Sequence, residues 1–272
     1  MEELKMFGMP IMFDEETDKL SSSDKNVNWE DYSRKYSDGM FGLLAEDHYN
    51  VKDNPYYDFY KAIVNDNDKA EFVKANLRYD CTVIMKGCAD KEFKKTAGHF
   101  HCFIPGKNMS YPELYQVVRG TALFVMQKVD NVNKVNDKMT VEDVILAEVK
   151  AGQAVVIPPN YGHCTINISD ETMVFVNLVS MDSSNYYESV KNSHGMCCYV
   201  YRNDDGTYRI EKNPNYVFNC GIRIAVPSES DTLGIRNNVP IYTEFLKNTR
   251  KFAYLNNPEN YINDFFSLLK AK

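Results

Sequence analysis

The sequence predicts a mainly β protein with a jelly-roll barrel as its main part. Between residues 81 and 180 the chain consists of short β-branched and aromatic runs separated by turn residues, a pattern typical of a sandwich or barrel. Few helical patterns lie between these runs, which argues against a parallel α/β sheet, because parallel strands need long crossover connections. We favour a jelly roll because it can place a ligand cavity between its two sheets.

The chain of 272 residues is long enough for one sizeable core, and 44% of its residues are hydrophobic. We expect three parts: an N-terminal extension of loops and short helices that packs on the barrel (1–78), the jelly-roll β-barrel itself (79–230) and a helical C-terminal tail (231–272). Within the extension, residues 68–77 carry apolar positions on one side of a helix rather than the alternation of a strand.

Six runs in the barrel region have the composition of strands: 81–85, 114–118, 121–128, 141–149, 153–157 and 172–180. The polar residues 130–138 predict a hairpin insertion between two of these strands. Asp205 and Gly206 predict a further hairpin, because Asp-Gly readily supplies the positive φ that tight turns need.

The C-terminal end predicts a helix that docks on the sheet. Asn257 is a suitable N-cap residue, and Pro258 suits the first helical position. One apolar stripe follows at helical spacing, formed by Tyr261, Ile262, Phe265, Leu268 and Leu269.

The net charge of −7 and the pI near 5.3 argue against a nucleic-acid partner, which would require a basic surface to neutralise phosphates. No apolar run approaches the roughly 20 residues that span a bilayer, so we expect no membrane partner. The seven cysteines are an odd number, and the amino terminus lacks the basic segment and apolar run of a secretory signal. We therefore expect a cytoplasmic protein.

Three of the five histidines form a candidate metal site with one glutamate. His99 and His101 are two residues apart, so on a strand both side chains point to the same face. His163 and Glu113 add a third imidazole and a carboxylate, which together make a set of N and O donors that leaves coordination positions for water or substrate. The alternative is a group of half-buried barrel histidines that are hydrogen-bonded to backbone carbonyls.

Four other residues of ligand type receive no metal role. Cys102 and Cys164 directly follow two of the proposed ligands, so on strands they should face away from the metal and pack as small hydrophobic side chains. His48 and His194 lie outside the pattern, and we expect ordinary structural or surface positions for them.

The arrangement resembles the two sequence motifs of the cupin superfamily. The first motif has His-x-His, a gap, Glu, six residues and Gly, and the residues that match it are His99, His101, Glu113 and Gly120. The second has Gly, Pro, Gly-His and Asn, and the residues that match it are Gly152, Pro158, Gly162, His163 and Asn167. The gap before Glu113 is longer than in most cupins, and its sequence predicts a loop that leaves the register of Glu113 open.

Three longer segments resemble the cupin-type glucose-6-phosphate isomerases of archaea and some bacteria. They are TAGHFH (96–101), PELYQVVRGTALF (112–124) and AVVIPPNYGHCTINISDE (154–171). The resemblance covers about residues 78–215, and in that family a longer gap before the glutamate is usual. It implies a cupin jelly roll and the interconversion of glucose 6-phosphate and fructose 6-phosphate, a step of glycolysis and gluconeogenesis.

The resemblance also implies one divalent metal per chain, held by His99, His101, Glu113 and His163. A donor set of imidazoles and one carboxylate suits Fe, Mn, Zn or Ni, and we favour Fe or Mn. Related isomerases form dimers, so we expect a homodimer.

The same resemblance implies which residues contact the sugar phosphate. Thr96 and Gly98 match positions at the phosphate end of the substrate, and Thr82 is placed with them. Hydroxyl and backbone N–H groups of this kind can hold phosphate without a cationic side chain. Tyr115 and Tyr187 match catalytic positions beside the sugar, although most of the 19 tyrosines of the chain must simply pack.

Two chemical routes to isomerisation are open. In one, Glu113 or a nearby group removes a proton to give a cis-enediol; in the other, a metal orients the two carbons for a hydride shift. A carboxylate bound to a cation is a weak base, which counts against Glu113 as the base. Two alternatives to an isomerase use the same ligand set: a cupin dioxygenase or decarboxylase, and a non-catalytic cupin that binds a sugar phosphate.

Overall fold

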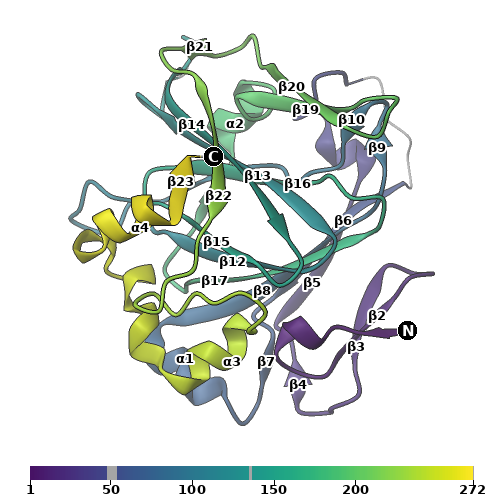
Figure 1. The fold of residues 1–272 in the computed structure, drawn as a ribbon, viewed down its shortest axis with the longest axis vertical. Helices are drawn as coiled ribbons and strands as arrows, with labels where there is room; N and C mark the ends of the chain where they lie inside the picture. The colour runs from purple at the N-terminus through teal and green to yellow at the C-terminus, as the bar shows by residue number, and fades with distance from the viewer. Residues whose placement is uncertain (48–53, 135–136, 272) are drawn as a thin grey trace.

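A computed structural model describes residues 1–47, 54–134 and 137–271, and it consists of two facing β-sheets with helices packed outside them (Figure 1). The first sheet has the order β15 (Ala154–Ile157), β12 (Glu113–Arg119), β17 (Met173–Ser180), β8 (Leu77–Ile84), β6 (Pro55–Lys61) and β5 (Asp31–Tyr36). The second has the order β16 (Gly162–Asn167), β13 (Thr121–Val129), β14 (Thr140–Lys150), β22 (Ile222–Pro227) and β23 (Leu269–Ala271), with β21 (Val217–Phe218) also on β14.

Short strands and helices surround the two sheets. The small sheets contain β1 (Glu2–Glu3), β2 (Ile11–Asp14) and β3 (Lys19–Ser22); β4 (Val27–Asn28) and β7 (Val64–Asn65); β11 (Phe100–His101) and β18 (Asn185–Tyr186); and β9 (Cys88–Ala89), β10 (Glu92–Phe93), β19 (Cys198–Arg202) and β20 (Tyr208–Lys212). The α-helices are α1 (Lys69–Ala75), α2 (Glu188–Asn192), α3 (Ile241–Lys247) and α4 (Ile262–Leu268). Four 3-10 helices span Lys5–Phe7, Ser37–Met40, Thr249–Leu255 and Pro258–Asn260.

The mainly β jelly-roll fold expected from the sequence is confirmed, and each of the six predicted strand runs falls in a strand of one of the two large sheets. The hairpin after residue 202 joins β19 and β20, and Gly206 in its turn has φ +82°. None of the helices in the described parts of the chain is both long and apolar enough to cross a bilayer.

Strand pairing decides which side chains of the first sheet face inward. Thr82 on β8 is paired with Phe175 on β17 and with Phe59 on β6, so these three side chains lie on one face. Tyr115 on β12 is paired with Asn177, two residues from Phe175, and therefore shares that face. The inner face of the first sheet thus carries polar groups among its aromatic rings.

Apolar residues from both sheets fill much of the space between them, and this core includes Ile84, Val117, Phe124, Met126, Ile145 and Phe175. The opposite face of the first sheet packs against α1, α3 and the N-terminal strands in a second core, which includes Phe13, Phe72, Tyr79, Val176, Phe245 and Phe252. Because both faces of the first sheet are covered, its inner face is held rigidly from behind.

The N-terminal part differs from the expected extension of loops and helices. The only α-helix between Met1 and Leu77, apart from the undescribed residues 48–53, is α1, which lies within the predicted 68–77. β5 and β6 instead extend the first sheet beyond β8. On β6, Tyr56, Asp58 and Tyr60 are buried on one face, while Tyr57 and Phe59 on the other face line the interior. A strand with both faces in use lacks the simple polar alternation that marks an exposed strand.

The C-terminal tail is helical, but the single predicted helix is interrupted. A 3-10 turn covers Pro258–Asn260, α4 begins only at Ile262, and the Asn257 side chain makes no capping hydrogen bond. Leu269 ends the apolar stripe in β23, where its backbone is paired with Pro227 of β22. Phe265 is buried against the sheet, so the predicted docking is confirmed. Strand pairing at Leu269 therefore replaces the last helical turn.

Candidate metal centre and substrate pocket

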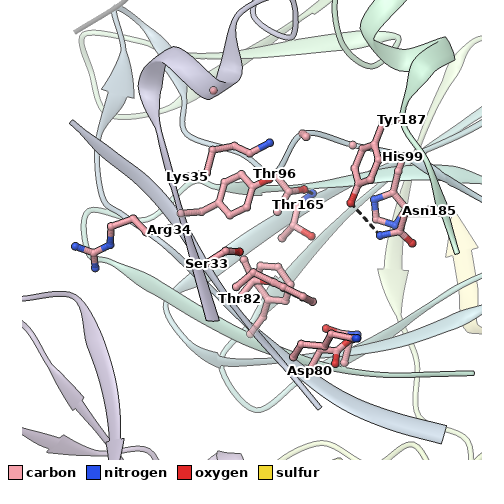
Figure 2. Close-up of a pocket in the computed structure, with 18 of the residues that line it drawn as sticks. Ser33, Arg34, Lys35, Asp80, Thr82, Thr96, His99, Thr165, Asn185 and Tyr187 are labelled. Atoms are coloured by element: carbon pink, nitrogen blue, oxygen red, sulfur yellow. Dashed lines mark hydrogen bonds between the residues drawn. The ribbon is translucent and has the colours of Figure 1, made fainter. Parts of the chain in front are cut away.

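A cavity of about 770 Å³ opens between the two sheets (Figure 2). Its walls come from the inner faces of β5, β6, β8, β12 and β17 and from the segment 96–99 that runs beside β16. All of the residues expected to contact the sugar or to act in catalysis line this one cavity: Thr82, Thr96, Gly98, Glu113, Tyr115 and Tyr187. A cavity of this size is in the range of pockets that bind small polar metabolites.

The four predicted metal ligands converge at one end of the cavity. The donor atoms of His99, His101, Glu113 and His163 all lie within 4.8 Å of one another. His101 Nε2 lies 3.1 Å and His163 Nε2 lies 3.2 Å from Glu113 Oε2. The His99 and His101 Nε2 atoms are 3.2 Å apart. Three imidazole nitrogens and one carboxylate oxygen therefore surround a single point.

Each ligand comes from a different structural feature. His99 is held next to β16 by two backbone hydrogen bonds with His163, at 3.1 and 2.9 Å. His101 is in β11, and Glu113 is the first residue of β12. Between them, the Ile104 N–H donates to the Met109 carbonyl at 2.9 Å. This hydrogen bond closes the loop and brings its two ends together, so that Glu113 lies beside His101 despite the long gap between them in the sequence.

Two hydrogen bonds orient the ligands. His101 Nδ1 lies 2.8 Å from the Tyr111 carbonyl oxygen, and a hydrogen bond donated by Nδ1–H to this oxygen leaves Nε2 as the nitrogen that faces the site. The Asn177 amide donates to Glu113 Oε1 at 2.6 Å. Glu113 Oε2 is buried and receives no hydrogen bond from the described residues. A buried carboxylate oxygen without a donor, facing three imidazoles, fits a divalent cation.

The protonation states also suit a metal. Burial lowers the pKa of His99 well below its usual range, with help from the neighbouring His163 and His101, and burial likewise lowers the pKa of His163. For Glu113, burial raises the pKa, but the close His101 and His163 imidazoles outweigh it and hold the pKa well below its usual range. Neutral imidazoles and an ionised carboxylate are the forms that bind metal.

A β-bulge shapes the segment before the first ligand. Lys95 is bridged to Ile166, and His99 is bridged to His163. Between these two bridges the segment 95–99 advances by four residues, whereas β16 advances by three, so the segment contains one extra residue. Gly98 has φ +77°, and a Cβ there would lie 2.8 Å from the Met196 sulfur. Only glycine is tolerated at this position without a shift of its neighbours. The bulge points Gly98 and the residues before it into the cavity.

The bulge offers polar groups to a ligand. The Thr165 N–H donates to Thr96 Oγ1 at 3.0 Å, which leaves the Thr96 hydroxyl hydrogen able to donate elsewhere. No backbone carbonyl in the described ranges accepts the Gly98 N–H. Thr82 lies on the inner face of β8 and lines the same cavity. Hydroxyl and N–H donors grouped in this way suit an anionic oxygen ligand.

The two tyrosines lie on different sides of the metal centre. The Tyr115 hydroxyl is buried and 2.9 Å from His163 Nε2, and burial raises the pKa of Tyr115 well above its usual range, so the hydroxyl keeps its proton. Tyr187 is half exposed; its ring centroid is 5.3 Å from that of His99, and its hydroxyl accepts a hydrogen bond from Asn185 at 3.0 Å (Figure 2).

His194, Cys164 and Cys102 take no part in the four-residue cluster. His194 lies at the surface, with Nδ1 3.7 Å from Asp47, and His48 lies outside the described residues. Cys164 is buried in the core behind the second sheet, as expected for a residue that faces away from His163. Cys102 is partly exposed and accepts a hydrogen bond from the Ser184 N–H, so it does not pack as a core residue.

The sequence did not point to several pocket residues. Asn177 interrupts an apolar strand two residues from Phe175, and this polar residue in a buried run was a usable signal. Arg78 and Asp80, which pair at 2.8 Å on β8, follow the same pattern. Lys35 on β5 carries no such signal, because β5 lies far before the ligand motifs and its place in the sheet depends on long-range pairing.

Comparisons with known proteins identify the family to which the chain is similar. A family model described as glucose-6-phosphate isomerase (GPI) matches residues 33–218, more than half of the chain. That match begins at β5, earlier than the resemblance seen in the sequence. The glucose-6-phosphate isomerase of Thermococcus kodakarensis is 25% identical over 218 residues, which cover 79% of this chain and 99% of that protein. The Thermococcus onnurineus protein of the same name is 24% identical, covering 76% of this chain and 95% of that protein.

Among solved structures, the oxalate decarboxylase of Lactobacillus farciminis superimposes with a TM-score of 0.31 and 19% identity, over 45% of this chain and 28% of that one. Hazelnut vicilin superimposes with a TM-score of 0.34 and 14% identity, over 50% of this chain and 33% of that one. These overlaps are too partial to bear on activity. With the family model matched over most of the barrel and the four ligands in place, the chain belongs to the glucose-6-phosphate isomerase family of cupin type.

Proposed function

We propose that the protein interconverts glucose 6-phosphate and fructose 6-phosphate in the cavity between the two sheets. The observation that carries this proposal is the meeting, in one pocket, of a four-residue metal site and the Thr96 and Gly98 donors, within the region that matches the isomerase family. The test is a coupled assay that detects glucose 6-phosphate formed from fructose 6-phosphate. Absence of product with every metal tried would contradict the proposal.

His99, His101, Glu113 and His163 would hold one divalent ion, and we favour Fe or Mn as its identity. Such an ion supplies Lewis-acid polarisation of the sugar carbonyl and stabilises negative charge that develops on the neighbouring oxygens. Side chains of the protein supply hydrogen bonds to the sugar. The Tyr115 hydroxyl stands 2.9 Å from His163 Nε2 and keeps its proton, so it can donate a hydrogen bond to a sugar oxygen once that nitrogen is engaged.

The surroundings of Glu113 support a hydride shift rather than proton removal by this residue. Its Oε1 accepts a hydrogen bond from Asn177 at 2.6 Å, and its Oε2 lies between the His101 and His163 nitrogens. Neither oxygen is therefore free in the way that a general base needs to be.

We therefore predict that fructose 6-phosphate turned over in deuterium oxide yields glucose 6-phosphate with no deuterium at C2. The expected result follows because a hydride that moves directly between C1 and C2 never exchanges with solvent. Mass spectrometry or proton NMR of the product measures the label. Full incorporation of one deuterium at C2 would contradict the hydride route. It would favour the proton-transfer route, with a group other than Glu113 as the base.

We further propose a cytoplasmic homodimer that acts in glycolysis and gluconeogenesis. Cupins commonly pair through sheet edges, and β5 forms one edge of the first sheet within the chain. Light scattering of the metal-loaded protein is expected to give about twice the 31.4 kDa of one chain. A mass equal to that of one chain at micromolar concentration would contradict the dimer.

A further inference from the structure

We propose that Lys35, on the edge strand β5, binds the phosphate group of the substrate and so sets a preference for phosphorylated sugars. The inference rests on the proposed function, because it adds a residue to the same pocket. It adds a cationic side chain to the hydroxyl and backbone N–H groups that the sequence suggests for the phosphate.

Strand register directs Lys35 into the cavity. β5 pairs with β6 so that Ser33 is opposite Phe59 and Lys35 is opposite Tyr57. Phe59 is in turn opposite Thr82, whose side chain lines the pocket, so Ser33 and Lys35 lie on the inner face. Figure 2 shows the Lys35 amine directed into the pocket on the side of Thr96, away from the outward-pointing Arg34 beside it in the chain.

Packing holds the stem of this lysine in place. Lys35 Nζ is 5.4 Å from the centroid of the Tyr57 ring. A Cβ on Gly39 would lie 3.0 Å from Lys35 Cγ, so the aliphatic stem rests against that glycine. A lysine whose stem is fixed loses less side-chain entropy when its amine binds a ligand.

In the parts of the chain that the structure describes, the charge of Lys35 has no carboxylate partner. The three other cationic side chains that line the pocket are each paired with a carboxylate: Arg34 with Asp58, Lys61 with Glu30, and Arg78 with Asp80. Within residues 1–47, 54–134 and 137–271, no carboxylate forms an ion pair with Lys35. Burial raises the pKa of Tyr57 to about 12, so the neighbouring ring is neutral and does not supply an anion.

The position of Lys35 suits an anionic ligand. Burial lowers the pKa of Lys35, which means that its charged form is poorly solvated. A phosphate monoester carries close to two negative charges near pH 7 and would restore that solvation. Thr96, towards which the Lys35 amine points in Figure 2, adds a hydroxyl donor, and Gly98 lines the same pocket. In a chain with net charge −7, such a local cation favours the binding of an anionic substrate.

The alternative is that Lys35 only packs against Tyr57 as a structural contact. Lys35→Met separates the two roles, because methionine keeps much of the stem and removes the charge. Lys19→Met is the matched control, since Lys19 Nζ lies 6.0 Å from the Tyr32 ring, makes a similar contact and lies outside the pocket.

In the metal-loaded enzyme, Lys35→Met is expected to raise KM for fructose 6-phosphate about tenfold to a hundredfold, as loss of a hydrogen bond to a charged group does. We expect kcat to change by less than about threefold, metal content to stay unchanged, and Lys35→Arg to recover part of the loss. Lys19→Met is expected to behave as the wild type.

Calorimetric binding of sorbitol 6-phosphate and of sorbitol separates this inference from the proposed function. If the wild type shows no isomerase activity but Lys35→Met weakens sorbitol 6-phosphate binding, the proposed function is wrong and the phosphate-binding role of Lys35 is supported. An active wild type whose KM and sorbitol 6-phosphate affinity are both unchanged by Lys35→Met overturns the inference alone. Loss of metal together with kcat in Lys35→Met also overturns it, because that result marks a structural role.

Discussion

Replacement of His163 by alanine is expected to remove bound metal and to lower isomerase activity on the order of a thousandfold. His163 supplies one of four donor atoms, and its backbone also pairs with His99, so its imidazole stands at the centre of the site. Loss of one ligand weakens the others, because Glu113 Oε2 then faces two imidazoles instead of three. Metal polarisation contributes several kcal/mol to such reactions, which corresponds to about a thousandfold in rate.

The variant is measured by metal analysis after gel filtration and by the coupled assay. His194→Asn is the matched control, because His194 lies at the surface with φ +54° and asparagine tolerates that backbone conformation. We expect the control to keep wild-type metal content and activity. Circular dichroism checks that His163→Ala is folded. A folded His163→Ala that retains both metal and activity would refute the ligand assignment.

The His99 and His101 pair of the proposed ligand set could be predicted from the sequence because its geometry is local. His99 and His101 are two residues apart, and the distance between imidazoles on one strand face follows from the strand repeat alone. The barrel strands were equally predictable, because a run such as 172–180 is buried on both faces in the structure and is mostly apolar in the sequence, with Asn177 as a polar interruption.

The wall that faces the metal site could not be predicted in this way. β5 pairs with β6, and β6 pairs with β8, mostly across more than 20 residues, and nothing local marks Lys35 as the residue that enters the cavity. The charge pairs Arg34–Asp58 and Arg78–Asp80 also arise only after the sheet forms. Long-range pairing, rather than helix propensity, therefore decided the structure of the N-terminal part.

The position of Glu113 shows where a motif alone is insufficient. Eleven residues separate it from His101, and a loop of that length is compatible with many registers. The bridge between Phe103 and Ser110, together with the Ile104–Met109 hydrogen bond, selects one of them. Asn177 then fixes the carboxylate by binding Oε1. The ligand is placed by tertiary contacts that follow from the fold and not from the spacing.

Removal and return of the metal is expected to produce the second large effect. The buried cluster combines neutral imidazoles with an ionised carboxylate, and no group of the described residues donates a hydrogen bond to Glu113 Oε2 in place of a cation. Protein treated with chelator and then desalted should therefore lose activity by about a thousandfold, following the same metal contribution. The fold should remain, because large apolar cores lie outside the site.

The most direct measurement is the coupled isomerase assay on chelator-stripped protein reloaded with one metal at a time, with Mg²⁺ as a control that prefers all-oxygen ligands. The account predicts negligible glucose 6-phosphate formation by the stripped protein, recovery with Fe(II) or Mn(II), and little recovery with Mg²⁺. Full activity in protein shown to be free of metal, or no activity with any metal, would contradict it.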